Sequence, residues 1–348
     1  MGDLLNCFKN DNKINIRALI AILVCLAIIV GIVVFDFAKN NREYQTTAVA
    51  MGTVINVRVF GSEGEAIAHD IKDNISETEK ALLSRTEDDS DIYRINEAAG
   101  TAVSVSTETV SIISDALEVS KDCDGVFDIT IGEITKLWGF GTDNQRLPSD
   151  DEINSHLSDV AYSSVELTDT TVRIAEKQSL DLGAVGKGAA CDRVRVLLAY
   201  SPADSAVVSV GGSLLLYGKR SFNIGIVNPE NDQASLASLK LSDTCISTSG
   251  NYEKFFTRDG KTYHHILNAT TGYPANSALS GVTVICHSGV LSDALSTACY
   301  ILGYHSSLAL LEKYEAEAVF VYKDKTIRLT EGIEKIFTLT DESFTVIK

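Results

Sequence analysis

The chain has 348 residues, of which 45% are hydrophobic and 22% are charged. Its 47 Asp and Glu residues outnumber its 30 Lys and Arg residues, which gives a formal net charge of -17. A chain this acidic is not expected to use nucleic acid or an anionic membrane surface as its main partner.

The first element in chain order is an apolar segment near the N-terminus. No charged residue occurs from Ala18 to Phe35. A helix of this length spans about 27 Å, which is close to the hydrocarbon thickness of a bilayer. The segment therefore predicts a single transmembrane anchor over 18–36.

The orientation of this anchor follows from the basic residues around it. Lys9, Lys13 and Arg17 precede it, and this bias favours a cytoplasmic N-terminus over 1–17. The rest of the chain is then expected outside the cytoplasm, held at the cell membrane. Two alternatives stay open: a cleaved signal peptide, whose apolar region is usually shorter, and lipid attachment at Cys25.

A polar linker over 37–47 is expected next, followed by a globular domain over 48–348. Alternating apolar and polar residues predict a strand over 53–60. Apolar residues at helical spacing then predict a helix over 65–83.

The remaining pattern mixes helices and strands. A helix is predicted over 107–122, with Ser106 as its N-cap. Beyond Pro148, strands are predicted over 164–167, 171–174, 206–210, 222–227, 238–241 and 281–286, helices over 188–198, 292–302 and 306–314, and closing strands up to Val346. Because these elements do not follow a regular βαβ order, they indicate an α+β fold with a mixed, largely antiparallel sheet core flanked by helices.

The seven cysteines show no C-x-x-C spacing. This argues against zinc and iron–sulfur sites. Five of the cysteines follow the predicted anchor, which is an odd number, so at least one is expected to be free unless it pairs between chains.

Two segments carry residues suited to a metal and a phosphate. Asp293 and Thr297 are four residues apart, so they share one face of a helix and can hold a hard cation. Asp181–Gly188 places three glycines and Lys187 before a helix, which lets backbone N–H groups approach a phosphate. The spacing is neither Walker A nor a dinucleotide-binding fingerprint. A purely structural glycine turn is the alternative.

Two further stretches are unusually polar. Thr248–Gly250 and His264–Pro274 hold more polar groups than a turn requires. We interpret His264 as a structural histidine, whereas His265 gains interest from the motifs around it. Gly211 and Gly212 fit either a strand end or a ligand contact.

Taken in order, these motifs resemble the ApbE family, the FAD:protein FMN transferases. The matching pieces are Met51–Thr53, Asp89–Asn96, Gly125–Gly132 with Leu137–Gly141, Asp181–Gly188, Gly211–Gly212, Ser247–Gly250, His265–Gly272, and Val282–Val284 with Asp293–Thr297. They cover about residues 50 to 303 in the order found in the family.

The resemblance implies an ApbE-like fold and a Mg²⁺-dependent enzyme. Such an enzyme takes FAD as substrate, attaches FMN through a phosphoester bond to a Thr or Ser hydroxyl of an acceptor protein, and releases AMP. Similar proteins are commonly membrane-anchored outside the cytoplasm, where their acceptors are exported or membrane redox proteins. The predicted anchor agrees with this.

The resemblance also implies roles for single residues. The metal is expected among the backbone carbonyl of Ala184 and the residues Asp293, Ser296 and Thr297. FAD contacts are expected from Met51, Thr86, Val126, Phe127, Asp128, Asp181, Lys187 and Leu267. Asp293 and His265 are the candidate catalytic residues, with His265 as the base for the acceptor hydroxyl.

The chain departs from the family pattern at a few positions. Asn268 and Ala269 stand where the family usually has Asp-Pro, Thr86 stands where an aromatic residue is frequent, and Ile129 replaces a frequent proline. The change at Asn268 and Ala269 keeps open the alternative of a FAD pyrophosphatase that gives FMN and AMP. A flavin-binding protein without chemistry is a second alternative.

Overall fold

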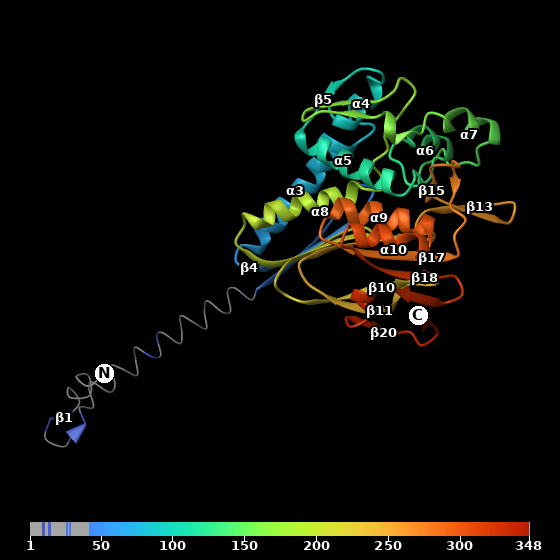
Figure 1. Ribbon diagram of the computed structural model, residues 1–348. Coiled ribbons are helices and arrows are strands. Elements are labelled where there is room, and N and C mark those ends of the chain that lie inside the picture. The colour runs from blue at the N-terminus through green and yellow to red at the C-terminus, as the bar shows by residue number, and fades with distance from the viewer. Residues whose placement is uncertain (1–8, 11–12, 15–25, 27, 29–41, 348) are drawn as a thin grey trace.

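The computed structural model describes residues 9–10, 13–14, 26, 28 and 42–347. Its centre is a nine-stranded sheet (Figure 1), whose strands in spatial order are β21 (Thr345–Val346), β19 (Thr326–Leu329), β18 (Glu317–Tyr322), β17 (Leu279–Cys286), β12 (Thr244–Gly250), β9 (Ser213–Gly218), β8 (Ala203–Val210), β4 (Thr53–Gly61) and β3 (Glu43–Ala50). Neighbouring strands are antiparallel except β19 and β21, which are parallel. The predicted α+β class with a largely antiparallel sheet is confirmed.

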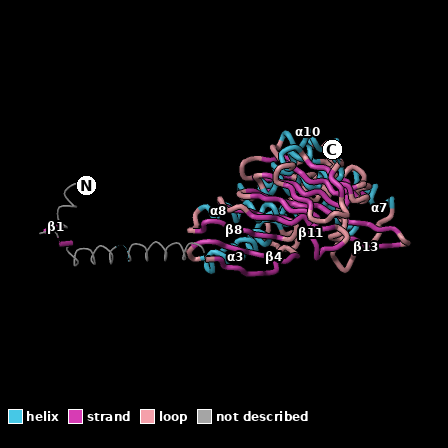
Figure 2. The backbone as a smooth tube through the Cα atoms, turned by 90° about the horizontal axis from the view of Figure 1, so that it is seen from below, coloured by secondary structure: helices cyan, strands magenta, loops and turns pink. Residues whose placement is uncertain are grey.

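Four helices cover one face of this sheet: α3 (Gly64–Thr78), α8 (Gly186–Ala199), α9 (Gly289–Leu302) and α10 (Tyr304–Lys313). In Figure 2, α3 runs beside β4 and α8 beside β8, in agreement with their contacts. The apolar faces of α3 and α8 pack on Ile55, Val57 and Val59 of β4 and on their neighbours in β8.

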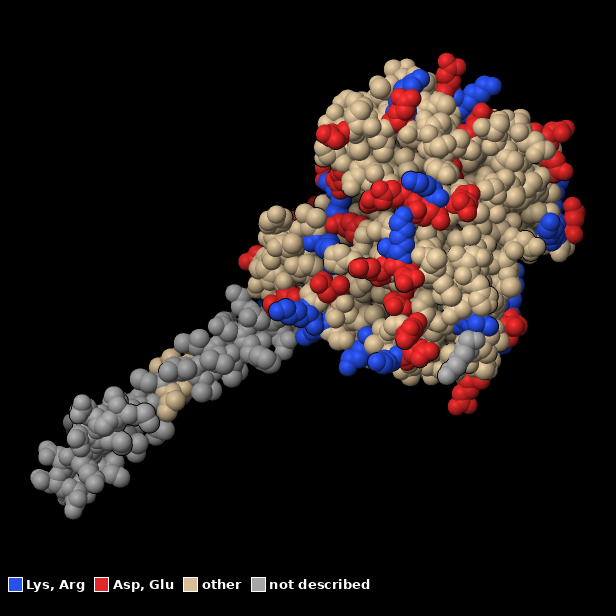
Figure 3. Space-filling model, viewed as in Figure 1, with Lys and Arg blue, Asp and Glu red and all other residues tan. Residues whose placement is uncertain are grey.

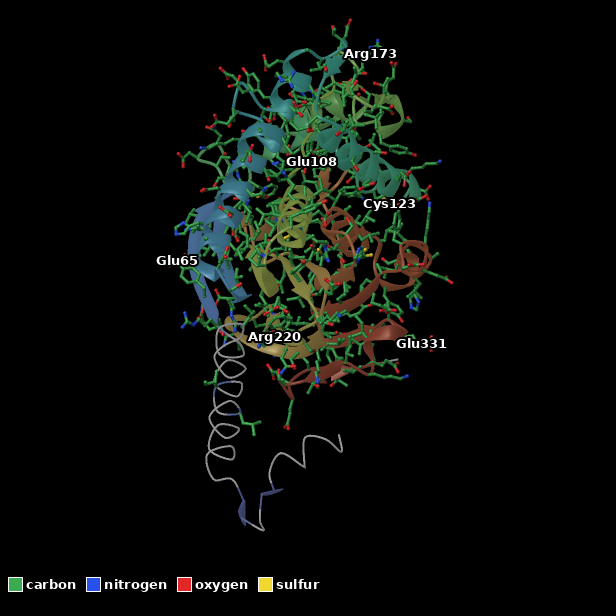
Figure 4. All side chains as sticks on the ribbon, turned by 90° about the vertical axis from the view of Figure 1, so that its left-hand side faces the viewer. Glu65, Glu108, Cys123, Arg173, Arg220 and Glu331 are labelled. Atoms are coloured by element: carbon green, nitrogen blue, oxygen red, sulfur yellow. The ribbon has the colours of Figure 1, made fainter. Side chains whose placement is uncertain are left out.

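The opposite face is covered by a small sheet of β10 (Phe222–Asn228), β11 (Asn231–Leu241) and β20 (Phe337–Leu339). Successive residues of a strand point to opposite faces. Accordingly, Cys245 belongs to the cluster under the helices, whereas Ile246 belongs to the cluster between the two sheets. In Figure 4, Arg220, just before β10, marks this small-sheet layer, and Arg173 marks the opposite end of the molecule.

The other elements form an upper lobe and several hairpins. The lobe contains α4 (Asp91–Glu97), α5 (Thr107–Asp122), α6 (Gly132–Trp138), α7 (Asp150–Leu157) and a small sheet of β5 (Val103–Ser104), β7 (Thr171–Arg173) and β6 (Glu166–Leu167). The hairpins pair β13 (Phe255–Arg258) with β14 (Lys261–His264), and β15 (Leu267–Asn268) with β16 (Tyr273–Pro274). Two 3₁₀ turns occupy Tyr162–Ser164 and Glu331–Ile333.

Several predicted elements are confirmed with small changes at their ends. The helix predicted over 107–122 is α5, and the Oγ of Ser106 accepts the backbone N–H of Thr109 at 3.0 Å, as an N-cap does. The helix predicted over 65–83 is α3 followed by a π-helical turn at Glu79–Leu83.

The predicted linker over 37–47 is wrong in its second half. Residues 43–47 belong to β3, which pairs with β4 along its whole length. Tyr44, Ala48 and Ala50 pack against the core under the helices. Their small and aromatic apolar groups alternate with polar ones, as in an edge strand buried on one face.

The predicted anchor over 18–36 lies outside the described residues, apart from Leu26 and Ile28. Within the part of the chain that the structure describes, no helix is long and apolar enough to cross a bilayer. The predicted cytoplasmic N-terminus is described only at β1 (Lys9–Asn10) and β2 (Lys13–Ile14), which pair with each other.

Candidate functional site

A cavity of about 610 Å³ lies between the upper lobe and the N-terminal ends of α8 and α9. We call it the main cavity. Its walls include most of the residues that the sequence singled out, namely Thr86, Phe127, Asp128, Asp181, Ala184, Lys187, His265, Leu267, Asp293, Ser296 and Thr297. They come from several elements that are distant in sequence, and only the folded chain brings them together.

The carboxylate of Asp293, in the second turn of α9, is held by three donors. Its Oδ1 accepts the hydroxyls of Ser213 and Ser247, both at 2.5 Å, and its Oδ2 accepts the backbone N–H of Gly188 at 2.7 Å. The residue is only 5% exposed. Because a carboxylate has about four lone-pair positions, these bonds fix its orientation and leave Oδ2 able to bind one more partner.

The N-terminal parts of α8 and α9 contact each other, and each helix supplies an aspartate that accepts N–H groups of the other. We call this contact the clasp. Asp293 of α9 caps α8 through Gly188, and Asp192 of α8 caps α9 by accepting the backbone N–H groups of Gly289 at 2.7 Å and Val290 at 3.0 Å. A Cβ on Gly188 would lie 2.0 Å from the carbonyl oxygen of Gly289. Gly188 is therefore required by the close approach of the two helices, which the phosphate interpretation of this motif did not anticipate.

The oxygen atoms expected to bind the metal lie around this clasp. The Oγ of Ser249 is 2.8 Å from Ser296 Oγ and 3.2 Å from Thr297 Oγ1, and Ala184 lines the same cavity. Carboxylate, hydroxyl and carbonyl oxygens are the donors that Mg²⁺ prefers. Among the described residues, no group of three or more His, Cys, Asp or Glu side chains is placed so that it could hold a metal ion, so a metal here would rely on the single carboxylate of Asp293.

Asp181 ties three segments together at the other side of the main cavity. Its Oδ2 accepts the hydroxyl of Thr135 at 2.6 Å and forms an ion pair with Arg85, and its Oδ1 accepts the backbone N–H of Gly183 at 2.8 Å. Sequence reasoning missed Arg85 and Thr135. The position of Arg85 directly before Thr86 was the one available hint.

The segment Val126–Asp128 is split between cavity and core. Phe127 lines the main cavity, whereas Val126 packs against the hydrophobic core. The carboxylate of Asp128 accepts the backbone N–H groups of Thr130 and Tyr162, each at 2.8 Å. Burial raises the pKa of Asp128, and these hydrogen bonds oppose that shift. Asp128 thus fixes the loop that presents Phe127.

His265 sits at the base of the β13–β14 hairpin. Its Nδ1 lies 3.2 Å from the carbonyl oxygen of Lys254. Because a carbonyl oxygen only accepts, Nδ1 carries the proton in the neutral ring and Nε2 is left as an acceptor. Burial, as the main cause, together with the nearby Lys254 and Lys187 lowers the pKa of His265 to about 4. The imidazole is therefore neutral near pH 7.

Lys187, Leu267 and Thr86 reach the main cavity, whereas Met51 does not. Lys187 is the second residue of α8, where the helix dipole adds to its positive charge. Met51 occupies the two-residue turn between β3 and β4 with a φ of 53°. Its backbone N–H donates to Glu79 in the π-helical turn at 2.7 Å, which holds it beside a second cavity.

An aromatic cluster and an acidic residue in the cavity walls were not predicted. Phe140 lines the main cavity and stacks on the buried Trp138, with ring centroids 5.4 Å apart. Glu253 also lines it, and burial raises the pKa of Glu253 while Lys187 and Lys254 oppose the shift. Phe140 belonged to a quoted motif, but nothing in the sequence pointed to Glu253.

The departures at Asn268 and Ala269 leave the site intact. Asn268 Oδ1 accepts the backbone N–H of Thr270 at 2.9 Å, which closes the turn in the same way as a carboxylate would. Asn268 is absent from the cavity wall, whereas Ala269 is part of it. The N–H of Ala269 donates to the carbonyl of Val126 at 3.0 Å, a bond that a proline cannot make.

The chain matches a known protein family and known proteins over most of its length. Residues 51–320 match the ApbE family. A FAD:protein FMN transferase of Treponema pallidum is 31% identical over 93% of this chain and 96% of its own length. Another, from Klebsiella pneumoniae, is 34% identical over 89% of this chain and 98% of its own length.

Solved structures agree in fold. The ApbE protein of Thermotoga maritima aligns with a TM-score of 0.77 at 30% identity, covering 84% of this chain and 98% of its own. The flavinyl transferase ApbE of Pseudomonas stutzeri, in its apo form, aligns with a TM-score of 0.72 at 27% identity, covering 87% and 95%.

Proposed function

The chain belongs to the ApbE family, and from this membership we propose that it is a FAD:protein FMN transferase. In the proposed reaction, FMN passes from FAD to a Thr or Ser hydroxyl of an acceptor protein, through a phosphoester bond, and AMP leaves. Mg²⁺ held by Asp293, Ser296, Thr297 and the carbonyl of Ala184 would neutralise pyrophosphate charge.

The observation that carries the proposal is the convergence of three chemical groups in the main cavity. The oriented carboxylate of Asp293, the cation of Lys187 and the neutral ring of His265 all line it. Its volume of about 610 Å³ lies in the range of cofactor sites. Phosphoryl transfer depends mainly on positioning and charge stabilisation, and these groups suit both tasks.

Each residue has a distinct task in this mechanism. Lys187, at the N-terminal end of α8 where the helix dipole is positive, binds the pyrophosphate through the charge of its side chain. The acceptor oxygen forms a bond to the phosphorus of the FMN half, the bond from that phosphorus to the bridging oxygen breaks, and the bridging oxygen leaves with AMP. Nε2 of His265 takes the proton of the acceptor hydroxyl. Phe127 and Phe140 offer flat apolar surfaces to the rings of FAD.

The alternative of a FAD pyrophosphatase rested on Asn268 and Ala269. Because Asn268 closes its own turn and is not part of the cavity wall, its lost charge does not change the groups around a bound pyrophosphate. The geometry therefore favours transfer to protein over hydrolysis.

The test uses the full chain in detergent with FAD, Mg²⁺ and membrane proteins from the same cells. Covalent flavin is detected by its fluorescence in a denaturing gel, which identifies the acceptor protein. The same protein is then purified without flavin and used as the acceptor. A mass gain of one FMN, lost with chelator and in Asp293→Ala, supports the transferase. Unmodified protein with free FMN and AMP would instead indicate a pyrophosphatase, and intact FAD would indicate a binding protein.

A further inference from the structure

A second cavity of about 570 Å³ adjoins the main one. We call it the rear cavity. It lies between the small sheet and the ends of the main-sheet strands, with Met51 and Gly211 in two of the hairpin turns at its wall. Four residues line both cavities, namely Lys187, Thr248, Glu253 and Lys254. We call this set the junction.

The junction places the rear cavity next to the reacting groups. Lys187 would bind the pyrophosphate, and Thr248 directly precedes Ser249, which contacts the predicted metal ligands Ser296 and Thr297. When FAD fills the main cavity, an acceptor hydroxyl needs a separate route to the phosphorus. The rear cavity reaches the same lysine, Lys187, that lines the main cavity.

One wall of the rear cavity is the edge strand β10. Its residues 224–227 line the cavity. Among the described residues β10 pairs only with β11, so its other edge has free backbone donors and acceptors. A strand of seven residues spans about 23 Å, which is enough to pair with a short extended peptide.

The sequence of β10 lacks the charged residues and prolines that often protect such an edge, although its register with β11 shifts at Ile226–Asn228. Proteins usually guard free edges with charged residues or proline. The strand reads Phe-Asn-Ile-Gly-Ile-Val-Asn from Phe222 to Asn228, with no charge and no proline. Val227 is 40% exposed. An uncharged, partly apolar edge beside a reaction site is suited to strand addition by a bound peptide, with the regular stretch from Phe222 to Ile226 available for pairing.

We propose that the acceptor protein docks as an extended segment along β10 in the rear cavity and presents its Thr or Ser hydroxyl at the junction. This inference rests on the proposed transferase function. Backbone pairing with β10 recognises the extended shape of the segment, and apolar contacts with Ile224 and Val227 favour apolar residues next to the modified one. The hydroxyl then meets the phosphorus from the side opposite the departing AMP.

The test compares two matched variants of the full chain in detergent. Val227→Lys puts a charge on the proposed docking edge, whereas Val346→Lys puts the same charge on β21, an edge strand outside both cavities where the valine is 42% exposed. For Val227→Lys we expect the KM for the purified acceptor to rise about tenfold while the KM for FAD stays unchanged. Val346→Lys is expected to change neither.

A second measurement does not depend on the variants folding well. A peptide of about ten residues around the modified position, mapped by mass spectrometry, is added to the wild-type chain, and amide hydrogen exchange is followed. We expect protection of residues 222–228 and none in β21.

The outcomes separate the docking proposal from the function. Transfer by the wild type with equal acceptor KM values in both variants and no protection of β10 overturns the docking proposal and leaves the transferase standing. No transfer to any protein overturns both. Self-association through β10, seen by light scattering and lost in Val227→Lys, makes a second copy the occupant and also overturns the proposal.

Discussion

At the scale of single residues, only a few charged groups are available for the proposed chemistry. The carboxylate of Asp293 is oriented by Ser213, Ser247 and Gly188, and the same carboxylate is the only one proposed to bind Mg²⁺. Glu253 belongs to the junction, but burial raises its pKa. In the proposed mechanism, function at this scale rests on the carboxylate of Asp293, the cation of Lys187 and the neutral ring of His265.

Asp293→Asn is expected to remove most of the activity. The amide keeps the size of the side chain but has a single acceptor oxygen and no charge, so metal binding is expected to weaken by at least about a hundredfold. Calorimetric titration with Mg²⁺ and the FMN mass gain of the acceptor measure the two effects. Asp169→Asn, in an exposed loop, serves as the control. Full activity of Asp293→Asn at low Mg²⁺ would contradict the assigned metal site.

The pH dependence tests the role of His265. Its pKa is lowered to about 4 by burial, below the ordinary value near 6.5. The ring is a base only when neutral, so the transfer rate is expected to stay level from pH 8 down to about 5 and to fall as the pH approaches 4. In His265→Ala this fall is lost and kcat drops by about a hundredfold or more. A wild-type rate that instead halves near pH 6.5 would contradict the lowered pKa. A fall near pH 4 that persists in His265→Ala would show that His265 is not the base.

At the scale of elements, the main device is the clasp of α8 and α9. Each helix supplies an aspartate that caps the other, and Gly188 and Gly289 permit the contact. Because Asp293 is both a cap and the proposed metal ligand, a change in helix packing also displaces the metal site.

Gly188→Ala is expected to destabilise the protein by roughly 3 kcal/mol, because the new Cβ would lie 2.0 Å from the carbonyl oxygen of Gly289. Denaturant unfolding measures this. Gly260→Ala is the control, since its φ is +77° but no atom lies within 4 Å of the added Cβ, so only a backbone cost of about 1 kcal/mol is expected. Equal losses in both variants would rule out the clasp as the cause.

Asp192→Ala removes the acceptor of the Gly289 and Val290 N–H groups at the start of α9, while the N-cap Ser288 stays, and is expected to cost about 1–2 kcal/mol. Since Asp192 acts through α9, it is a positioning residue, and the Mg²⁺ concentration needed for half-maximal transfer is expected to rise with little change in the KM for the acceptor. Denaturant unfolding and a Mg²⁺ titration of the rate provide both numbers. An unchanged Mg²⁺ requirement would limit Asp192 to a structural role.

At the scale of the whole molecule, three layers carry an upper lobe (Figure 1). The main cavity is lined by residues of the lobe and of the helix layer, and the rear cavity includes residues of both sheets in its walls. On the face seen in Figure 3, acidic and basic side chains are interspersed and do not form one basic patch. The edge strand β3 begins at Glu43, so the folded unit starts earlier than the sequence pattern suggested.

Removing residues 1–41 tests both the anchor and this boundary. The shortened chain keeps β3 and both cavities, so it is expected to transfer FMN with unchanged kcat and to move from the membrane fraction to the supernatant. A chain that begins at Met51 loses β3 and its packing by Tyr44, and its Tm is expected to fall by several degrees. Recovery of the full chain in the supernatant would contradict the anchor.

The sequence by itself determined local features and the family. Helical spacing and a side-chain cap located α5, because an amphipathic helix and its N-cap are encoded by nearby residues. The ordered motifs identified the family and eleven residues that line the main cavity. The short helices α4, α6 and α7 were missed, because one or two turns give too little periodicity to recognise.

Only the tertiary structure decided which groups act together. The pairing of Arg85 with Asp181, the three donors to Asp293 and the position of Glu253 join residues far apart in the chain. No local pattern encodes such contacts, since they arise when the sheet aligns its strand ends and the helices pack across them. The same holds for Gly188, whose small size is required by a helix about 100 residues away, and for β10, whose free edge exists only because the sheet stops there.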